Sequence, residues 1–208
     1  MEDLVLLSGI VHPAEIVEII ERINSVKPRW NLLGFLIDNR EIGSYYNGKP
    51  ILGSCKDIVK YPDVKVLPIP SAGKFEEDHG LLMESIISVI DPSCFVDSTV
   101  KIGKGVTLFP NCFVGHDTVM HDFVFSMTGS IINHDNVIES GVMIASGVNL
   151  AGHVHVERDC YLGAGTKVRQ GCRIGEGAMT GMGSVVVSDV EPHTVVVGNP
   201  AKKLRDRD

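Results

Sequence analysis

Residues 132–155 read INHDNV IESGVM IASGVN LAGHVH, four blocks of six that each begin with Ile or Leu. The register continues without an insertion from Ile90 to Val186, and nearly all of its first positions hold an aliphatic residue or Met. The exceptions are Ser126 and Thr180. The fifth position is almost always small or β-branched, and Gly recurs at the second and fourth. Chance periodicity does not persist over such a length, so the pattern predicts a repeat architecture.

Each block is expected to form a short strand followed by a turn. The aliphatic first residue points into a narrow core, the small fifth residue shares that core, and Gly supplies turn conformations that strain other residues. Three blocks close one triangular coil, so the repeat predicts a parallel β-helix over residues 89–208, roughly 27 Å tall at a strand spacing of about 4.8 Å. Four cysteines occupy fifth positions and are expected in the core: Cys94, Cys112, Cys160 and Cys172.

Charge and cysteine content exclude several classes of protein. The 208 residues carry a net charge of −7, which argues against a nucleic-acid binder because such proteins need a basic face. Five cysteines without a CxxC pair predict neither a disulfide framework nor a cysteine-rich zinc site. The N-terminal stretch places acids ahead of a short apolar run and has no basic segment, so we expect a cytoplasmic protein without membrane insertion.

Residues 1–88 lack the repeat and predict a small Rossmann-like α/β domain with a parallel sheet, which would bind the substrate. Ligands of such sheets bind at the C-terminal ends of the strands. The expected elements are strands at 4–7, 30–37 and 64–69, a helix at 13–23, and a helix or lead-in at 81–89. The strand ends are Ser8-Gly9, Asp38-Asn39-Arg40 and Pro70-Ser71-Ala72.

Two further stretches, SVIDPSCFVDSTVKIG at 88–103 and VVVGNPAKKL at 195–204, begin and follow the repeat. Together with the α/β domain, they resemble the bacterial sugar acyltransferases of the sialic-acid O-acetyltransferase type, which include N-acetyltransferases of amino-sugar nucleotides. The resemblance implies a left-handed β-helix, a homotrimer, acetyl-CoA bound between neighbouring subunits, and no metal. It also implies acyl transfer, chiefly acetyl transfer, to an amino or hydroxyl group of a sugar or nucleotide sugar, as in surface-glycan synthesis.

The catalytic base of this family is a His followed by an acid, and the matching pair is His134-Asp135. Imidazole has an unperturbed pKa of about 6.5, so it accepts a proton from an attacking amine or hydroxyl near neutral pH. Asp135 is expected to orient the ring or stabilise its charged form. One coil later, the backbone N–H of Gly152 is the expected oxyanion donor. One coil earlier, His116-Asp117 repeats the pair, but the family's His aligns with His134 and we expect His116 to be a surface residue.

The resemblance also implies an acyl-CoA groove along the last coils, where small residues let the pantetheine amides approach the backbone. The expected cofactor-binding residues are Met143, Gly152, Ala164, Gly165, Gly181, Met182, Gly198, Asn199, Pro200 and Lys202. The cations that either meet the CoA phosphates or are simply solvated are Lys167, Arg169, Arg173, Lys202 and Lys203. The expected substrate-binding residues are Ser8, Gly9, His12, Asp38, Asn39 and Arg40.

Three positions depart from the family pattern. A His commonly stands nine residues after the catalytic His, on the acyl-donor side, where this chain has Met143. The Gly-rich turn after the first strand keeps only Gly9 and His12, with bulkier residues between them. Pro70-Ser71 replaces a Gly-Asn pair after the third strand. The sequence therefore supports the acyl-CoA site better than the nucleotide-sugar site.

Two other functions stay open. A γ-carbonic-anhydrase-like zinc enzyme uses the same prism, and His116 and His121 have the spacing of two of its three ligands. The position expected for the third ligand, near Gly80 or Leu81, is not a His. A catalytically silent binding or assembly subunit would account for the departures from the family pattern. The sequence identifies neither the sugar acceptor nor the acyl chain, and it does not choose between N- and O-acylation.

Overall fold

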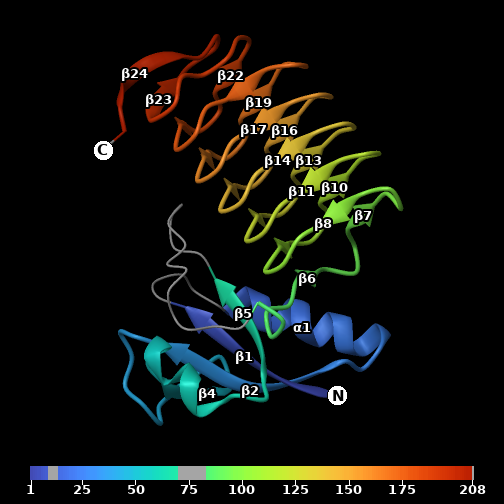
Figure 1. Ribbon diagram of the computed structural model, residues 1–208, viewed down its shortest axis with the longest axis vertical. Helices are drawn as coiled ribbons and strands as arrows, with labels where there is room; N and C mark the ends of the chain where they lie inside the picture. Colours follow the sequence, from blue (N-terminus) through green and yellow to red (C-terminus); the bar gives the residue numbers. More distant parts are fainter. Residues whose placement is uncertain (9–13, 70–82, 208) are drawn as a thin grey trace.

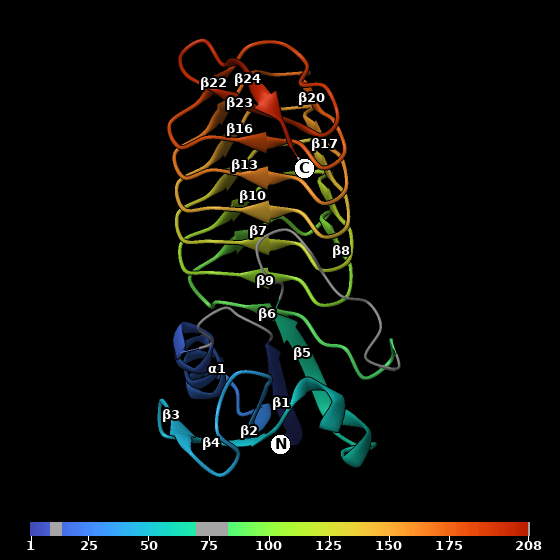
Figure 2. The same cartoon turned by 90° about the vertical axis from the view of Figure 1, so that its left-hand side faces the viewer.

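The computed structural model describes residues 1–8, 14–69 and 83–207, which form two adjoining parts (Figure 1). A small sheet with one helix comes first, and a column of stacked coils rises from it. The last strands lie at the end of the column that is far from the sheet (Figure 2). The expected site positions Gly9, His12 and 70–72 lie outside the described residues.

The N-terminal sheet has the strand order β3-β4-β2-β1-β5. Its pairings are parallel except that of β3 with β4, which is antiparallel. The strands are β1 (Glu2–Ser8), β2 (Trp30–Ile37), β3 (Tyr45–Tyr46), β4 (Lys49–Gly53) and β5 (Lys65–Ile69). The parallel strands expected at 4–7, 30–37 and 64–69 are therefore present as β1, β2 and β5, whereas β3 and β4 have no counterpart in the sequence-based prediction.

Helical elements cover both faces of this sheet. They are α1 (Ala14–Val26) and the 3-10 helix η1 (Cys55–Lys60). Successive residues of a strand point to opposite faces. Accordingly, Leu4 and Leu6 of β1 pack in the cluster that contains α1, while Val5 and Leu7 pack in the cluster that contains η1. α1 buries one side through residues at helical spacing: Ile16, Val17, Ile19 and Ile20.

The repeat folds as a parallel β-solenoid. Strands three blocks apart pair in register, so that Phe113 lies opposite Ile131, and Ile131 opposite Asn149. The three faces of the solenoid are sheets with the orders β22-β19-β16-β13-β10-β7, β20-β17-β14-β11-β8 and β24-β23-β21-β18-β15-β12-β9-β6. This register confirms that three blocks form one coil and that successive coils stack.

Most of the solenoid strands are two residues long. They are β6 (Val89–Ile90), β7 (Phe95–Val96), β8 (Lys101–Ile102), β9 (Thr107–Leu108), β10 (Phe113–Val114), β11 (Val119–Met120), β12 (Phe125–Ser126), β13 (Ile131–Ile132), β14 (Val137–Ile138), β15 (Met143–Ile144), β16 (Asn149–Leu150), β17 (His155–Val156), β18 (Tyr161–Leu162), β19 (Lys167–Val168), β20 (Arg173–Ile174), β21 (Met179–Thr180) and β22 (Val185–Val186). Two longer strands, β23 (Thr194–Val197) and β24 (Lys202–Asp206), pair antiparallel at the far end.

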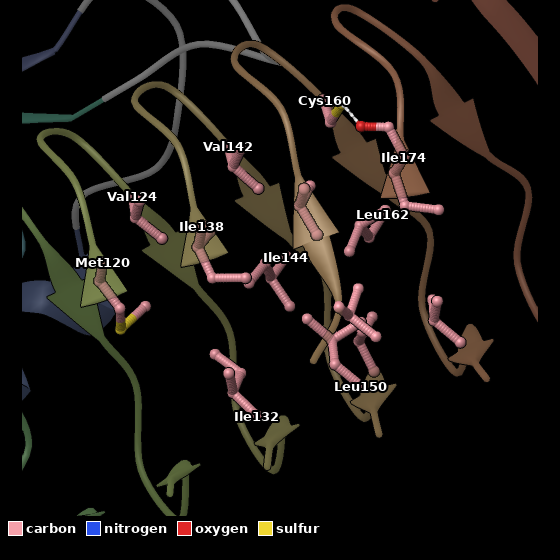
Figure 3. Close-up of a cluster of buried hydrophobic side chains, with 14 of the residues drawn as sticks. Met120, Val124, Ile132, Ile138, Val142, Ile144, Leu150, Cys160, Leu162 and Ile174 are labelled. Carbon is pink, nitrogen blue, oxygen red and sulfur yellow. Dashed lines mark hydrogen bonds between the residues drawn. The ribbon is translucent and has the colours of Figure 1, made fainter. Parts of the chain in front are cut away.

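The first and fifth positions of the blocks build the solenoid core (Figure 3). Ile132 and Leu150 are fully buried. The polar first position Thr180 is also buried, and its Oγ1 lies 2.8 Å from Thr166 Oγ1, so the hydroxyl keeps a hydrogen-bond partner in the core. The cysteines follow the prediction: the fifth-position thiols are buried, apart from the half-buried Cys94, and all five cysteines are free.

One apolar cluster joins the sheet to the solenoid. Side chains of α1 and of the sheet pack with Val89, Phe125 and Met143 on the solenoid. Beside this cluster, Arg22 of α1 forms an ion pair with the buried Asp91 of the first coil. The structure thus places Met143, expected on the acyl-donor side, in the junction with 8% of its surface exposed.

Among the described residues, no helix has the length and apolarity that a membrane span requires.

Candidate active site

His134 and Asp135 lie on the turn between β13 and β14, where their side chains meet. His134 Nδ1 is 2.7 Å from Asp135 Oδ2, and this hydrogen bond is the main reason why the pKa of Asp135 lies below its usual range. Because an ionised carboxylate only accepts hydrogen bonds, Nδ1 carries the proton of the neutral His134 ring. Nε2 then holds the lone pair, and it has no hydrogen-bond partner among the described residues. The arrangement leaves Nε2, on a half-exposed side chain, able to accept a proton.

Gly152, one coil after His134, provides the surface against which the imidazole lies. A Cβ built on Gly152 would overlap Cε1 of the His134 ring, so a larger residue would displace that ring. Within the described part of the chain, the Gly152 N–H makes no hydrogen bond, although its carbonyl accepts one from the Gly171 N–H at 3.1 Å. An unpaired backbone donor beside the candidate base is what an oxyanion site requires.

We expect Gly152→Ala to lower kcat for acyl transfer by about 10²-fold, because a displacement of about 1 Å in a catalytic group has an effect of that size. The backbone of Gly152 is not in the left-handed region, so Ala itself is not strained there and the melting temperature should change little. Steady-state kinetics and a thermal melt measure the two effects. In a His134→Ala background, the Gly152→Ala change should have no further effect on kcat; an equal loss there would contradict this account.

The pair one coil earlier is held differently. His116 Nδ1 lies 3.1 Å from Thr99 Oγ1 and 3.4 Å from Asp97 Oδ1. His116 Nε2 lies 3.2 Å from Asp117 Oδ2. Both ring nitrogens of His116 therefore face polar partners on the protein, whereas Nε2 of His134 faces none. This difference favours His134 as the candidate base.

A histidine that the sequence analysis did not single out lies beside the pair. His153 Nε2 is 3.8 Å from Asp135 Oδ2. The rings of His134 and His153 are perpendicular, with centroids 5.3 Å apart. The signal that points to His153 is the coil period: His153 follows Asp135 by one coil, as His134 follows His116.

The zinc-enzyme alternative depends on His116 and His121. His134, Asp135 and His153 are the one group of three metal-ligating side chains in the described residues, and neither His116 nor His121 belongs to it. The position expected for a third ligand beside them, 80–81, lies outside those residues. Within the part of the chain that the structure describes, no third ligand therefore lies with His116 and His121.

Four of the expected acyl-CoA residues occupy a different corner of the prism from His134 and Gly152. Ala164 and Gly165 lie on the turn after β18, and Gly181 and Met182 lie on the turn after β21, both on the sheet that includes β15. His134 and Gly152 follow strands of the neighbouring sheet, β13 and β16. Met182 has 84% of its surface exposed. Within one chain, these residues and the candidate base thus flank opposite edges of one face of the solenoid.

The loop at 198–200 is bonded to the last coil. The Val185 N–H donates to the Gly198 carbonyl at 2.9 Å, and the Ala201 N–H donates to the Val185 carbonyl at 2.8 Å. The Asn199–Pro200 peptide is cis. Gly198, Asn199, Pro200 and Lys202 are all exposed. They are therefore accessible to a ligand at the far end of the solenoid.

The structure separates the expected phosphate-binding cations into two groups. Arg173 Nε donates to Glu157 Oε1 at 2.7 Å, and Lys203 Nζ lies 2.6 Å from Asp206 Oδ1, so both charges are already paired. The remaining cations are exposed and have no ion-pair partner in the described ranges: Lys167, Arg169 and Lys202. These three are the better candidates for CoA phosphates.

The expected substrate residues that the structure describes lie at the C-terminal ends of β1 and β2: Ser8, Asp38, Asn39 and Arg40. Ser8 ends β1 and is buried. Asp38 follows β2, and its Oδ1 accepts a hydrogen bond from the Cys55 N–H at 2.8 Å, so it supports η1. Burial, with the Asp38 charge as a second cause, raises the pKa of the Cys55 thiol to about 12. Asn39 is exposed, and the Arg40 guanidinium lies 4.0 Å from the centre of the Tyr46 ring.

Several solved structures share this fold over nearly the full chain. The acetyltransferase domain of PglB from Neisseria gonorrhoeae matches with a TM-score of 0.86 and 21% identity, covering 98% of this chain and 100% of that one. The perosamine N-acetyltransferase from Caulobacter crescentus, solved with CoA and GDP-perosamine, matches with a TM-score of 0.88 and 21% identity, covering 99% and 98%. WeeI from Acinetobacter baumannii matches with a TM-score of 0.81 and 24% identity, covering 97% and 100%.

Curated protein sequences are also similar to parts of this chain. The chain is 40% identical over 102 residues to the acyl-[acyl-carrier-protein]–UDP-N-acetylglucosamine O-acyltransferase of Pseudomonas aeruginosa, a match that covers 49% of this chain and 40% of that protein. The enzyme of the same name from Campylobacter concisus is 29% identical over 159 residues, covering 76% and 56%. The chain thus spans about half the length of these relatives. No family model matches the chain.

Proposed function

We propose that this protein transfers an acetyl group from acetyl-CoA to an amino or hydroxyl group of a sugar, carried as a nucleotide sugar, with His134 as general base. The observation that carries the proposal is the His134 Nδ1–Asp135 hydrogen bond, which leaves Nε2 open beside the unpaired N–H of Gly152. The solved acetyltransferases of the same fold, one of them with CoA and GDP-perosamine, support this choice of donor and acceptor.

In the proposed reaction, the acceptor nitrogen or oxygen attacks the thioester carbonyl carbon while its proton passes to His134 Nε2. The new N–C or O–C bond forms, the C–S bond breaks, and the proton on His134 passes to the leaving thiolate to give CoA. Asp135 stabilises the imidazolium, and the Gly152 N–H donates to the oxyanion. General-base catalysis of this kind contributes about 10²–10⁴-fold to the rate.

The proposed assembly is a homotrimer of left-handed prisms in the cytoplasm. An exposed apolar stripe on one face of the solenoid supports an interface there: Phe95, Phe113 and Ile131 expose 55%, 37% and 38% of their surfaces. The Phe95 and Phe113 rings are stacked, with centroids 5.1 Å apart. The stripe lies on the face between the His134 corner and the Ala164 corner, so packing of two copies there would bring one copy's base to the other's acyl-CoA residues.

A thermal-shift experiment with acetyl-CoA, CoA and a panel of nucleotide sugars tests the proposal. A ligand at 100 times its Kd stabilises the native state by about 2.7 kcal/mol, so a true ligand raises the melting temperature. We expect acetyl-CoA and at least one nucleotide sugar to do so, and that pair to release CoA thiol when mixed with the protein. No shift with any of them, and no thiol release, would favour a silent subunit instead.

A further inference from the structure

The Asp135 carboxylate lies between two imidazoles. Its Oδ2 accepts a hydrogen bond from His134 Nδ1 at 2.7 Å and faces His153 Nε2 at 3.8 Å. The second separation is that of an ion pair and is too long for a hydrogen bond. Among the described residues, the side-chain partners of His153 are Asp135 and the His134 ring. One carboxylate oxygen is thus contacted from two sides, by the candidate base and by a second titratable ring.

The repeat brings His153 to this place. Asp117, Asp135 and His153 occupy the same position in successive coils, with φ of 52°, 57° and 56°. The next coil has Gly171 there, with φ of 75°. Left-handed backbone favours Gly, although Asp, Asn and His tolerate it better than other residues do. Residue 153 is therefore a His at a position where the next coil has a Gly. Strained backbone beside a candidate active site points to a role for the side chain that it carries.

The backbone fixes how the two histidines approach each other. The His153 N–H donates to the His134 carbonyl at 3.1 Å, which ties the two turns together. Gly152 precedes His153 and has no side chain, so the His134 ring lies against its backbone. As a result, the rings meet edge to face, with centroids 5.3 Å apart, and Asp135 is enclosed on both sides.

We propose that His153 is a positioning residue for acyl transfer: it holds the Asp135 carboxylate against His134 Nδ1 and so keeps the lone pair of His134 on Nε2. The expected effect of His153 on kcat rests on the proposed function, whereas its role in orienting Asp135 and His134 does not. The geometry explains why the carboxylate needs holding, since Asp135 is 40% exposed and sits on a turn. The electrostatic interaction with His153 is also one of the causes, after the His134 hydrogen bond, that lower the pKa of Asp135.

Kinetics of His153→Asn test the consequence for catalysis. Asn tolerates the left-handed backbone, so the variant should fold. We expect kcat to fall about 10-fold, a part of the roughly 10²–10⁴-fold that a general base contributes, with both KM values within about twofold of wild type. In an Asp135→Asn background, His153→Asn should have almost no effect on kcat. His153 is proposed to act only through the Asp135 carboxylate, which that background lacks. An equal loss in both backgrounds, or no loss in the wild-type background, would overturn the proposal.

His193→Asn is the matched control. His193 is an exposed histidine with φ of 52°, and its ring lies beside Gly177, which follows β20 on another sheet of the solenoid. The control therefore makes the same His-to-Asn change at a residue with left-handed backbone, but at a different corner of the solenoid. We expect it to leave kcat unchanged; a loss equal to that of His153→Asn would assign the effect to the backbone and overturn the proposal.

Nitrogen-15 NMR of the imidazoles tests the proposal without turnover. We expect the neutral His134 ring to be mostly the Nδ1–H tautomer in the wild type and to shift toward the Nε2–H tautomer in His153→Asn but not in His193→Asn. The resonances are assigned by their loss in His134→Ala. An unchanged tautomer in His153→Asn would overturn the proposal. Because this measurement needs no acceptor, an enzyme that fails to transfer acetyl overturns the proposed function and leaves this test of His153 intact.

Discussion

Replacing His134 by Ala is expected to lower kcat/KM for acyl transfer by about 10²–10⁴-fold, because the attacking amine or hydroxyl then has no positioned acceptor for its proton. The side chain is half exposed and its main partner is the exposed Asp135, so we expect the free energy of unfolding to change little. Acetyl-CoA should still bind and raise the melting temperature, since most of the residues expected to hold it lie away from the His134 corner. Thiol release and a thermal shift measure the two properties on one preparation.

His116→Ala provides the matched control for this experiment. His116 lies one coil earlier, is also exposed, and also stands beside an Asp, but both of its ring nitrogens already face protein partners. We expect the control to keep the wild-type rate within about twofold. Full activity in His134→Ala would remove His134 as the base, and a loss confined to His116→Ala would transfer that role to His116.

Replacing Arg22 by Met is expected to destabilise the protein by about 3 kcal/mol, because it leaves a buried carboxylate without its countercharge. The Asp91 side chain is fully buried, and Arg22 contacts both of its oxygens, at 3.0 Å from Nη2 to Oδ1 and 2.9 Å from Nε to Oδ2. Ser93 donates to Oδ1 through its N–H and its hydroxyl, which offsets part of the loss. Met retains most of the length of the side chain, so the change isolates the charge. Urea denaturation followed by circular dichroism measures the effect.

The double variant Arg22→Met, Asp91→Asn is the control. Asn keeps an oxygen for the two Ser93 donors and removes the buried charge, so we expect it to recover more than half of the lost stability. The pair joins α1 to the first coil, and its loss should therefore loosen the junction of the two parts before it affects the far coils. A change of less than about 0.5 kcal/mol in Arg22→Met would show that water or Ser93 alone stabilises Asp91.

The solenoid was predictable because its causes are local and repeated. An aliphatic residue at every sixth position needs a core, and the intervening Gly and Asp residues permit the turns. The sequence of each coil therefore specifies the structure of that coil. The same period correctly predicts that Cys112, Cys160 and Cys172 are core residues. The period by itself also stacks His116 under His134 and Asp135 under His153. The strands β1, β2 and β5 of the N-terminal sheet were likewise predictable, since each contains an apolar run.

Other features depended on contacts between distant residues. β3 has only two residues, and the apolar stretch of β4 is limited to Ile51 and Leu52 after a Pro, so no clear signal marks either strand. Met143 was expected in the acyl-CoA groove because it follows His134 by nine residues in the sequence. In the structure it packs in the cluster that contains residues of α1 and of the N-terminal sheet. The pairing of Arg173 with Glu157 and of Lys203 with Asp206 likewise removes two cations that the sequence alone leaves available.

The sequence by itself determined the coil, its register and the order of residues along each corner, because a six-residue period specifies which positions stack. Tertiary structure decided which of the stacked groups meet. His134 bonds to Asp135 while His116 turns to Thr99, and His153 faces the same carboxylate from the next coil. Ring directions of this kind depend on the packing of neighbouring coils, such as the absence of a Cβ at Gly152, and a period carries no information about them.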